Sequence, residues 1–359
     1  MKRIIFLLFI GLLALASCNQ NQKVNSKQEF DVVILNGRVM DPETNFDGVR
    51  NVGIKDGKIA LITEGEIKGK ETIDAAGLVV APGFIDGHQH CILPYIYPMM
   101  LRDGRTTIMD LEIGTPGPKI DEFYKSHEGK SPINFGVSVS HEFARAAVLD
   151  GFNDWKYLHT PDVVASRVKQ GWARTKPNLE QGNQILEEID EGLRFGGIGV
   201  GSTLGYMRYG ISSRELFEVQ KLAAAYGRCL SVHLRLTPGD DVQEVLGVQE
   251  LLANAAALNA PAIAAHFNNP GYNLVHELLT RMREQGHNVW GELYPYNAGM
   301  TVLNAVFLDA DVWVKQLGYK YEETLQDVET GEFYTEESRN EMLKKEPTRG
   351  VVVFKMPES

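Results

Sequence analysis

GFIDGHQH, residues 83–90, carries two histidines, His88 and His90, at the end of an apolar run that begins at residue 78. Such a run predicts a buried strand, and on a strand the side chains at i and i+2 project from one face with Cα atoms about 6.6 Å apart. Both imidazoles can therefore converge on one cation. A lone histidine on an apolar strand is more often a core residue, but a pair at this spacing, preceded by an Asp and two glycines, indicates a metal site.

The composition is that of a globular protein with a small-molecule partner. The chain has 359 residues, 43% of them hydrophobic and 23% charged, which is enough to build one large α/β domain and a small one. Acidic residues outnumber basic ones by 47 to 36, so the sequence offers no basic surface for nucleic acid. The oligomeric state is left open.

The first residues have the pattern of a secretion signal. Lys2 and Arg3 precede an apolar stretch at 4–15 that is too short to cross a bilayer comfortably, and LASC at 15–18 places small residues before Cys18. This pattern predicts a bacterial lipoprotein signal peptide at 1–17, lipid on Cys18, and a polar tether at 18–29. We therefore expect a lipid-anchored protein of the bacterial cell envelope, on its periplasmic or outer-membrane face, with no other membrane contact.

Residues 30–78 predict a small β-domain. Short β-type runs occur at 32–35, 51–54, 59–62 and 72–74. The pairs Asn36-Gly37 and Asp56-Gly57 can supply the positive φ angles that tight hairpin turns require. We expect a hairpin turn at each pair.

From residue 79 to 359 the pattern changes to alternating strands and helices. Seven strands are predicted at 78–86, 106–112, 133–140, 196–203, 229–235, 260–267 and 287–294, with amphipathic helices at 213–226, 241–258 and 272–285. Alternation of this kind predicts a parallel sheet. The α/β fold expected first is a (β/α)8 (TIM) barrel, and an open doubly wound sheet is the alternative.

Polar residues gather where the predicted strands end, which is where a barrel of this type places its active site. They are His88, His90, Asp110, Glu112, His141, His233, Arg235 and His266. Zinc binds imidazole nitrogen and carboxylate oxygen, and its catalytic sites keep one position open. The other histidines, at 127, 159, 276 and 287, fall on helices, in loops or at a strand start, and receive no role.

Several motifs together resemble one known family. PGFIDGHQH is followed by NFGVSVSHEFAR at 134–145, GGIGVGSTLGYMRYG at 196–210, VHLR at 232–235 and YPYNAGMT at 294–301. In this order they are similar to the N-acyl-D-amino-acid deacylase (D-aminoacylase) family of the amidohydrolase superfamily, from residue 31 to the end.

The resemblance implies one or two zinc ions. His88 and His90 would form one metal subsite, and His233 with His266 the other. Family members usually have a Cys on strand two, and here the expected ligand is Glu112, with Asp110 as the alternative. No Lys lies on the fourth strand, so a carbamylated Lys is not expected.

The resemblance also implies substrate-binding residues and a reaction. Arg235 and Tyr206 are candidates to hold a carboxylate, although Arg235 could equally form a structural ion pair. Tyr294 is a further candidate, and Asn268 replaces the lysine of many relatives. The implied reaction is hydrolysis of N-acyl-D-amino acids or related small amides by metal-activated hydroxide. Alternatives are a cyclic-amide hydrolase or dipeptidase of the same superfamily, and a surface lipoprotein that binds a ligand without turnover.

The family's proton-shuttling Asp lies on strand eight, and no Asp after residue 311 has a strand-end context. Residues 302–349 resemble the insertion that precedes this strand. We therefore expect a barrel that lacks its last strand, a C-terminally truncated relative of the family with an unknown catalytic acid, and low activity and stability for these 359 residues alone.

Overall fold

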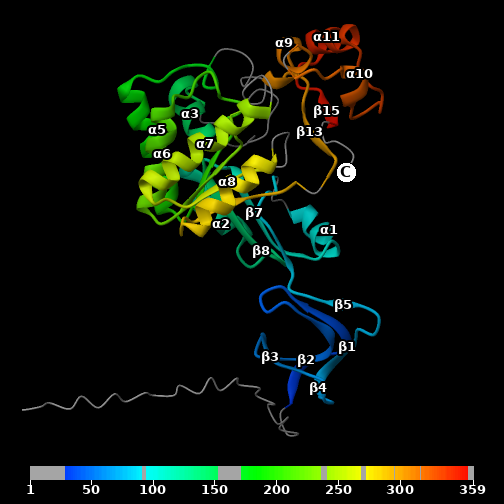
Figure 1. Ribbon diagram of the computed structural model, residues 1–359. Coiled ribbons are helices and arrows are strands. Elements are labelled where there is room, and N and C mark those ends of the chain that lie inside the picture. Colours follow the sequence, from blue (N-terminus) through cyan, green and yellow to red (C-terminus); the bar gives the residue numbers. More distant parts are fainter. Residues whose placement is uncertain are drawn as a thin grey trace, which may run out of the picture. The chain divides into compact units, whose positions relative to one another are not determined.

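The computed structural model describes residues 29–90, 94–152, 171–235, 241–267, 272–294, 296–315 and 317–354. These residues form two compact units that divide after Pro82 (Figure 1). Cys18 and Asn268 lie outside the described residues. Within the described part of the chain, none of the helices has the length and apolar character needed to span a membrane.

The first unit is a β-sheet. Its strands are β1 (Phe30–Asp41), β2 (Phe46–Lys55), β3 (Lys58–Thr63), β4 (Gly69–Asp74) and β5 (Val79–Val80). They are ordered β3-β2-β1-β4, and β5 also pairs with β1. Strand β1 is antiparallel to β2 but parallel to β4 and β5. Phe30, Val33 and Ile67 form the core of this unit.

Of the two predicted hairpin turns, one is confirmed and one is wrong. Asp56 and Gly57 have φ angles of 52° and 72° and join β2 to β3. Asn36 also has a positive φ, 62°, but β1 continues through it.

Asn36 belongs to a bulge, because the pairing of β1 with β2 shifts register between Ile34 and Gly37. The Asn36 backbone N–H donates to the Asn51 side chain at 2.9 Å, which holds the bulge in the sheet. A Cβ on Gly37 would lie 2.4 Å from a methyl of Val80, so the glycine permits a close approach and does not reverse the chain.

The second unit is built on seven parallel strands that follow one another in sequence order. They are β6 (Phe84–Asp86), β7 (Arg105–Thr115), β8 (Asn134–Ser140), β9 (Gly199–Ser202), β10 (Cys229–Val232), β11 (Ala262–Ala264) and β12 (Val289–Gly291). Six of the seven predicted strands are confirmed. The first, predicted as one buried strand at 78–86, is wrong in part: Val79–Val80 pair with β1 in the first unit, and only Phe84–Asp86 join this sheet. Because β6 is the edge strand of the sheet, Phe84 and Ile85 are exposed. The order does not reverse, as it would in a doubly wound sheet, and the sheet curls into half a barrel.

Helices connect these strands and pack along the sheet (Figure 1). They are η1 (Pro94–Ile96), α1 (Tyr97–Arg102), η2 (Gly117–Lys119), α2 (Ile120–His127), α3 (His141–Asp150), α5 (Leu179–Arg194), α6 (Ser213–Ala225), α7 (Asp241–Leu258) and α8 (Tyr272–Glu284). The three predicted helices match α6, α7 and α8. Their apolar stripes join the main core, which includes Val139, Phe143, Trp172, Ile185, Leu216, Leu230, Leu251 and Leu279.

Residues 298–354 add a small antiparallel sheet with its own core. Its elements are β13 (Ala298–Val302), η4 (Val306–Leu308), α9 (Ala310–Trp313), α10 (Tyr321–Thr324), β14 (Leu325–Asp327), α11 (Glu336–Lys345) and β15 (Gly350–Phe354). The strand order is β13-β15-β14. Trp313, Tyr321 and Val351 are fully or almost fully buried in this core. The segment that the family resemblance implies as an insertion therefore packs around apolar residues of its own.

Candidate metal centre

Four histidines surround the buried carboxylate of Glu112, which lies on β7. Its Oε2 atom is 2.5 Å from His88 Nε2 and 3.3 Å from His90 Nε2. Its Oε1 atom is 2.7 Å from His233 Nδ1 and 3.7 Å from His266 Nε2. The structure thus brings together all five residues that the sequence offers as metal ligands, from the ends of four different strands.

The histidines form two pairs, and each pair faces one oxygen of Glu112. The Nε2 atoms of His88 and His90 are 3.0 Å apart, and so are His233 Nδ1 and His266 Nε2. Ligand atoms of His88, Glu112 and His266 all lie within 4.8 Å of one another. Nitrogen and carboxylate oxygen at these separations are the donor set that zinc prefers, so the residues present fit such an ion.

The charges of the centre also favour a cation. Burial lowers the pKa of His88, but the carboxylates of Glu112 and Glu292 outweigh burial and raise the pKa to about 11. Burial lowers the pKa of His90 as well, and Asp110 with Glu112 raises it to about 9. These carboxylates therefore stabilise positive charge between them, either as protons on the imidazoles or as metal ions that replace those protons.

Glu292, which follows β12, is a residue of this centre that the sequence analysis missed. Its Oε2 atom lies 2.7 Å from His88 Nδ1 and accepts a hydrogen bond of 3.2 Å from the backbone N–H of His266. A carboxylate on the second ring nitrogen of a metal-binding histidine fixes the tautomer and the orientation of the ring. Its position at the end of the seventh predicted strand was the available signal.

Asp110 occupies a different position from Glu112, although both lie on β7. Its Oδ2 atom is 3.2 Å from His90 Nδ1. Its Oδ1 atom accepts the backbone N–H groups of Ile113 and Gly114 at 3.0 and 3.1 Å. Asp110 therefore contacts the outer nitrogen of one histidine, whereas Glu112 reaches all four.

The predicted substrate-binding residues have different surroundings. Tyr206 lies beside His233, with ring centroids 4.8 Å apart, and its hydroxyl is 3.3 Å from Thr301 Oγ1. Tyr294 follows β12, and burial raises the pKa of its hydroxyl. Its ring centroid is 5.1 Å from that of Tyr296.

Arg235 is tied to neighbouring groups. Its Nε donates to Glu250 Oε2 at 3.1 Å, and its Nη1 donates to the carbonyl of Arg208 at 2.7 Å. A third hydrogen bond, from Nη2 to the carbonyl of Ile211, measures 3.3 Å. The guanidinium therefore forms a structural ion pair with Glu250 and holds the segment that follows β9 through the carbonyls of Arg208 and Ile211.

His141 lies outside the group around Glu112. It is fully buried, with Nδ1 3.0 Å from Ser202 Oγ and Nε2 3.1 Å from Glu215 Oε1. Glu215 also binds the guanidinium of Arg145, which is fully buried too. These contacts join α3 to α6 and give His141 a structural role.

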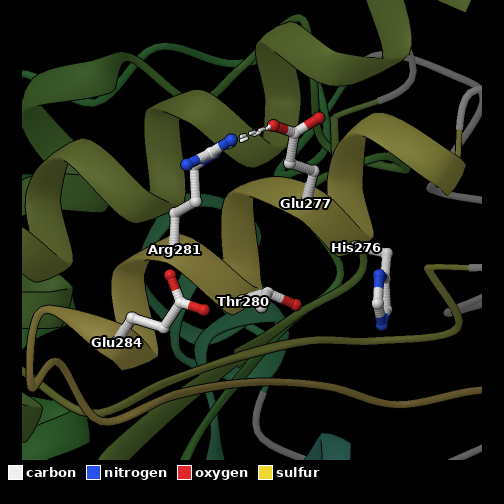
Figure 2. Close-up of a pocket in the computed structure, with 5 residues that line it drawn as sticks. All are labelled: His276, Glu277, Thr280, Arg281 and Glu284. Atoms are coloured by element: carbon white, nitrogen blue, oxygen red, sulfur yellow. Dashed lines mark hydrogen bonds and ion pairs between the residues drawn. The ribbon is translucent and has the colours of Figure 1, made fainter.

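A separate surface hollow lies on α8 and is lined by His276, Glu277, Thr280, Arg281 and Glu284 (Figure 2). Arg281 Nε donates to Glu277 Oε1 at 2.8 Å, an ordinary i,i+4 pair of an exposed helix face. All five residues belong to one helix, and none belongs to the group around Glu112. The hollow is a solvated helix surface, which agrees with leaving His276 without a role.

Comparison with known proteins supports the same fold. The chain is 25% identical over 301 residues to N-acyl-D-glutamate deacylase of Alcaligenes xylosoxydans, a match over 77% of the chain and 59% of the relative. It is 23% identical over 317 residues to D-aminoacylase of the same organism, a match over 78% of the chain and 60% of the relative. The chain thus spans about three fifths of the length of these two relatives. No protein-family model matches it.

The chain also has a short match of higher identity and is similar in fold to solved structures. Over 60 residues, 16% of the chain and 14% of the relative, the chain is 55% identical to a dihydroorotase of Streptococcus pneumoniae. A zinc complex of N-acyl-D-glutamate deacylase from Bordetella bronchiseptica superimposes with a TM-score of 0.70 at 20% identity, over 92% of this chain and 72% of that one. A crystal structure of D-aminoacylase gives a TM-score of 0.69 at 19% identity, with the same two coverages.

Proposed function

Because the chain resembles the D-aminoacylase family of the amidohydrolase superfamily, we propose that it is a metal-dependent hydrolase for N-acyl-D-amino acids or related small amides. The observation that carries the proposal is the position of Glu112, whose carboxylate has the ring nitrogens of four histidines within 3.7 Å. A buried carboxylate among four imidazoles is unfavourable without a cation. In a hydrolase, a metal ion bound there could activate water.

Five residues would hold the metal: His88, His90, Glu112, His233 and His266. Zinc bound there would lower the pKa of a water molecule toward about 7 and polarise the carbonyl of an amide. Glu292 would orient His88 through its Nδ1–H, so that Nε2 stays free of a proton and can bind the ion. Tyr206, beside His233, would form one wall of the substrate pocket.

The deacylase substrate is supported by the extent of the similarities. The two deacylase relatives match 77% and 78% of the chain. A cyclic amide is the second candidate, because the local identity to a dihydroorotase reaches 55%, although only over 60 residues. Cyclic-amide hydrolysis and deacylation both require attack of water on an amide carbonyl, so the same metal centre could serve either.

A substrate panel with defined metal content tests the proposal. The purified protein would be loaded with zinc and offered N-acetyl-D-amino acids, their L-enantiomers, dihydroorotate, hydantoins and β-aspartyl dipeptides. We expect turnover of the D-compounds that is lost in the His88→Ala, His90→Ala double variant. Turnover of dihydroorotate alone would favour the second candidate. Tight ligand binding without zinc and without hydrolysis would instead identify a binding lipoprotein.

We further propose that Cys18 carries a lipid that anchors the protein in the cell envelope. The support is the sequence pattern of residues 1–18, in which a basic start and a short apolar stretch precede LASC. Metabolic labelling with an alkyne fatty acid tests this: the wild-type protein should take up label and Cys18→Ala should not. Equal labelling of both would contradict the anchor.

A further inference from the structure

The charges of three arginines act on one carboxylate, that of Asp309, at the start of α9. Arg339 Nη2 lies 3.6 Å from Asp309 Oδ1. The guanidinium groups of Arg174 and Arg208 lie 5.0 and 4.8 Å from the ring centroid of Tyr209. Burial raises the pKa of Asp309, and the positive charges of all three arginines act against that rise. The group therefore consists of Asp309 with its neighbour Arg339, and of two arginines, Arg174 and Arg208, that share the ring of Tyr209.

Arg339 is the most buried member of the group, and Arg208 is buried as well. Its exposed fraction is 3%, and its Nε and Nη2 have no hydrogen-bond partner, since 3.6 Å is too long for a hydrogen bond to Asp309. Nη1 donates to Asn340 Oδ1 at 3.2 Å. A buried guanidinium with unsatisfied donors is strongly unfavourable, so a further acceptor at this position would be favourable.

The group adjoins the segment that borders the metal centre. Tyr206, two residues before Arg208, lies beside His233 with ring centroids 4.8 Å apart. The carbonyl of Arg208 accepts the hydrogen bond from Arg235, which ties this segment to the end of β10. Asp309 is 44% exposed at its side chain and Arg174 is exposed as well, so the group is open to solvent on one side.

We propose that Arg174, Arg208 and Arg339 form a binding site for a small carboxylate. A planar guanidinium matches the two oxygens of a carboxylate, and such charge-assisted pairs are among the stronger hydrogen bonds in proteins. The carboxylate could be that of the substrate or that of a separate small molecule. Assigning it to the substrate rests on the proposed hydrolase function, whereas carboxylate binding itself does not.

Thermal unfolding in sodium acetate, compared with sodium chloride at equal ionic strength, tests the site without any turnover. Acetate should raise the midpoint of the wild-type protein, and its apparent affinity should fall about tenfold in Arg174→Gln and in Arg339→Met. Arg214→Gln, an exposed arginine of α6, is the matched control and should keep the full effect. No acetate effect in the wild type, or an equal effect in all variants, would overturn the proposal.

Two precautions keep the test interpretable. Arg339→Met preserves the packing of the long side chain and removes a buried charge, so its midpoint in chloride should equal or exceed that of the wild type. Arg174 is exposed, so Arg174→Gln should fold normally. If every variant lost its acetate effect, including Arg214→Gln, the response would be nonspecific and the site would be rejected.

Kinetics then identify the source of the carboxylate. If the substrate supplies it, Arg174→Gln should raise KM for N-acetyl-D-alanine about tenfold and leave KM for the corresponding carboxamide unchanged. If a separate molecule supplies it, the acetate effect is lost while both KM values stay the same. A protein that binds acetate through these arginines but hydrolyses nothing would support the site and count against the proposed function.

Discussion

Glu112 Oε1 lies 2.7 Å from His233 Nδ1, although the two residues are 121 positions apart in the chain. The contact joins the ends of β7 and β10, and the other oxygen of the same carboxylate lies 2.5 Å from His88 at the end of β6. One side chain thus connects two histidine pairs that come from distant parts of the sequence. We expect the negative charge of Glu112, more than the shape of its side chain, to determine the metal affinity of the centre.

Glu112→Gln tests this, because it keeps the size of the side chain and removes the charge. We expect zinc affinity to fall by at least about 100-fold, measured by competition with a chromophoric chelator and by metal analysis after dialysis. Asp110→Asn is the matched control on the same strand and should lose less, because the side chain of Asp110 contacts His90, whereas that of Glu112 contacts all four histidines. A larger loss in Asp110→Asn would mean that Asp110 is the strand-two ligand.

Glu292→Gln should weaken zinc binding about 10- to 100-fold without unfolding the protein. The reason is that Glu292 accepts from His88 Nδ1 and from the backbone of His266, so its loss frees one ligand from each histidine pair. Nitrogen NMR of the imidazoles should show a mixture of His88 tautomers in the variant. Glu284→Gln, an exposed acid at the end of α8, serves as the control. An unchanged His88 spectrum in Glu292→Gln would rule out the orienting role.

The strand-end histidines and Glu112 could be predicted because they depend on local rules. The i, i+2 spacing of His88 and His90 and the alternation of strands and helices place them at one edge of a parallel sheet. Glu292 could not be distinguished in the same way, since a single acid after a strand is common on protein surfaces. The role of Glu292 depends on the register in which β12 pairs with β11, because this register places Glu292 beside His266.

Two other sequence expectations depended on partners that only the fold supplies. Asn36-Gly37 has the dihedral preference of a hairpin turn, but pairing with β2 on both sides of it converts the turn into a bulge. Arg235 had two possible roles, a ligand for a carboxylate or a structural ion pair. Glu250, which binds it here, lies on α7, and no local pattern links the two residues.

Zinc binding should release protons, and its affinity should fall as the pH falls. Without metal, the pKa values of His88 and His90 are about 11 and 9, so both rings are in the charged imidazolium form, with a proton on each ring nitrogen, at pH 7. Zinc must displace these protons, and we expect about two to be released per site at pH 7. Calorimetric titration in two buffers of different ionisation enthalpy counts them. Release of no protons would show that the imidazoles are already neutral.

Gly201→Ala should disturb the metal centre through the backbone. A Cβ at Gly201 would lie 2.3 Å from the carbonyl oxygen of Glu112, and backbone cannot move aside as a flexible side chain can. We expect a loss of stability of about 1–3 kcal/mol and weaker zinc binding.

The control for this substitution is Gly182→Ala in α5. Apart from the neighbouring backbone of the helix itself, no atom would lie within 4 Å of the new Cβ, and alanine favours a helix by up to about 1 kcal/mol over glycine. Urea unfolding of the zinc-free proteins compares the two. If Gly201→Ala and Gly182→Ala behaved alike, the close approach of β9 to Glu112 would be refuted.

Asp327→Asn should destabilise residues 298–354 at neutral pH and much less in acid. The carboxylate of Asp327 accepts from Arg349 Nε and Nη2, both at 2.9 Å, and from the hydroxyl of Tyr334, and these contacts lower its pKa. A carboxyl whose pKa is lower in the folded state adds stability above its unfolded pKa, which is about 3.9, and loses that contribution as the pH falls further.

We therefore expect the free energy of unfolding of Asp327→Asn to be lower than that of the wild type by about 1.5–3 kcal/mol at pH 7. The difference should shrink below about pH 4, where the unfolded chain binds a proton at this residue. Asp311→Asn, at an exposed position of α9 whose carboxylate pairs with the exposed Lys315, should change stability little at either pH. Urea titrations followed by the fluorescence of the buried Trp313 measure both variants. A difference that grew on acidification would mean that Asp327 is protonated in the native protein and that its pairing with Arg349 does not hold this sheet together.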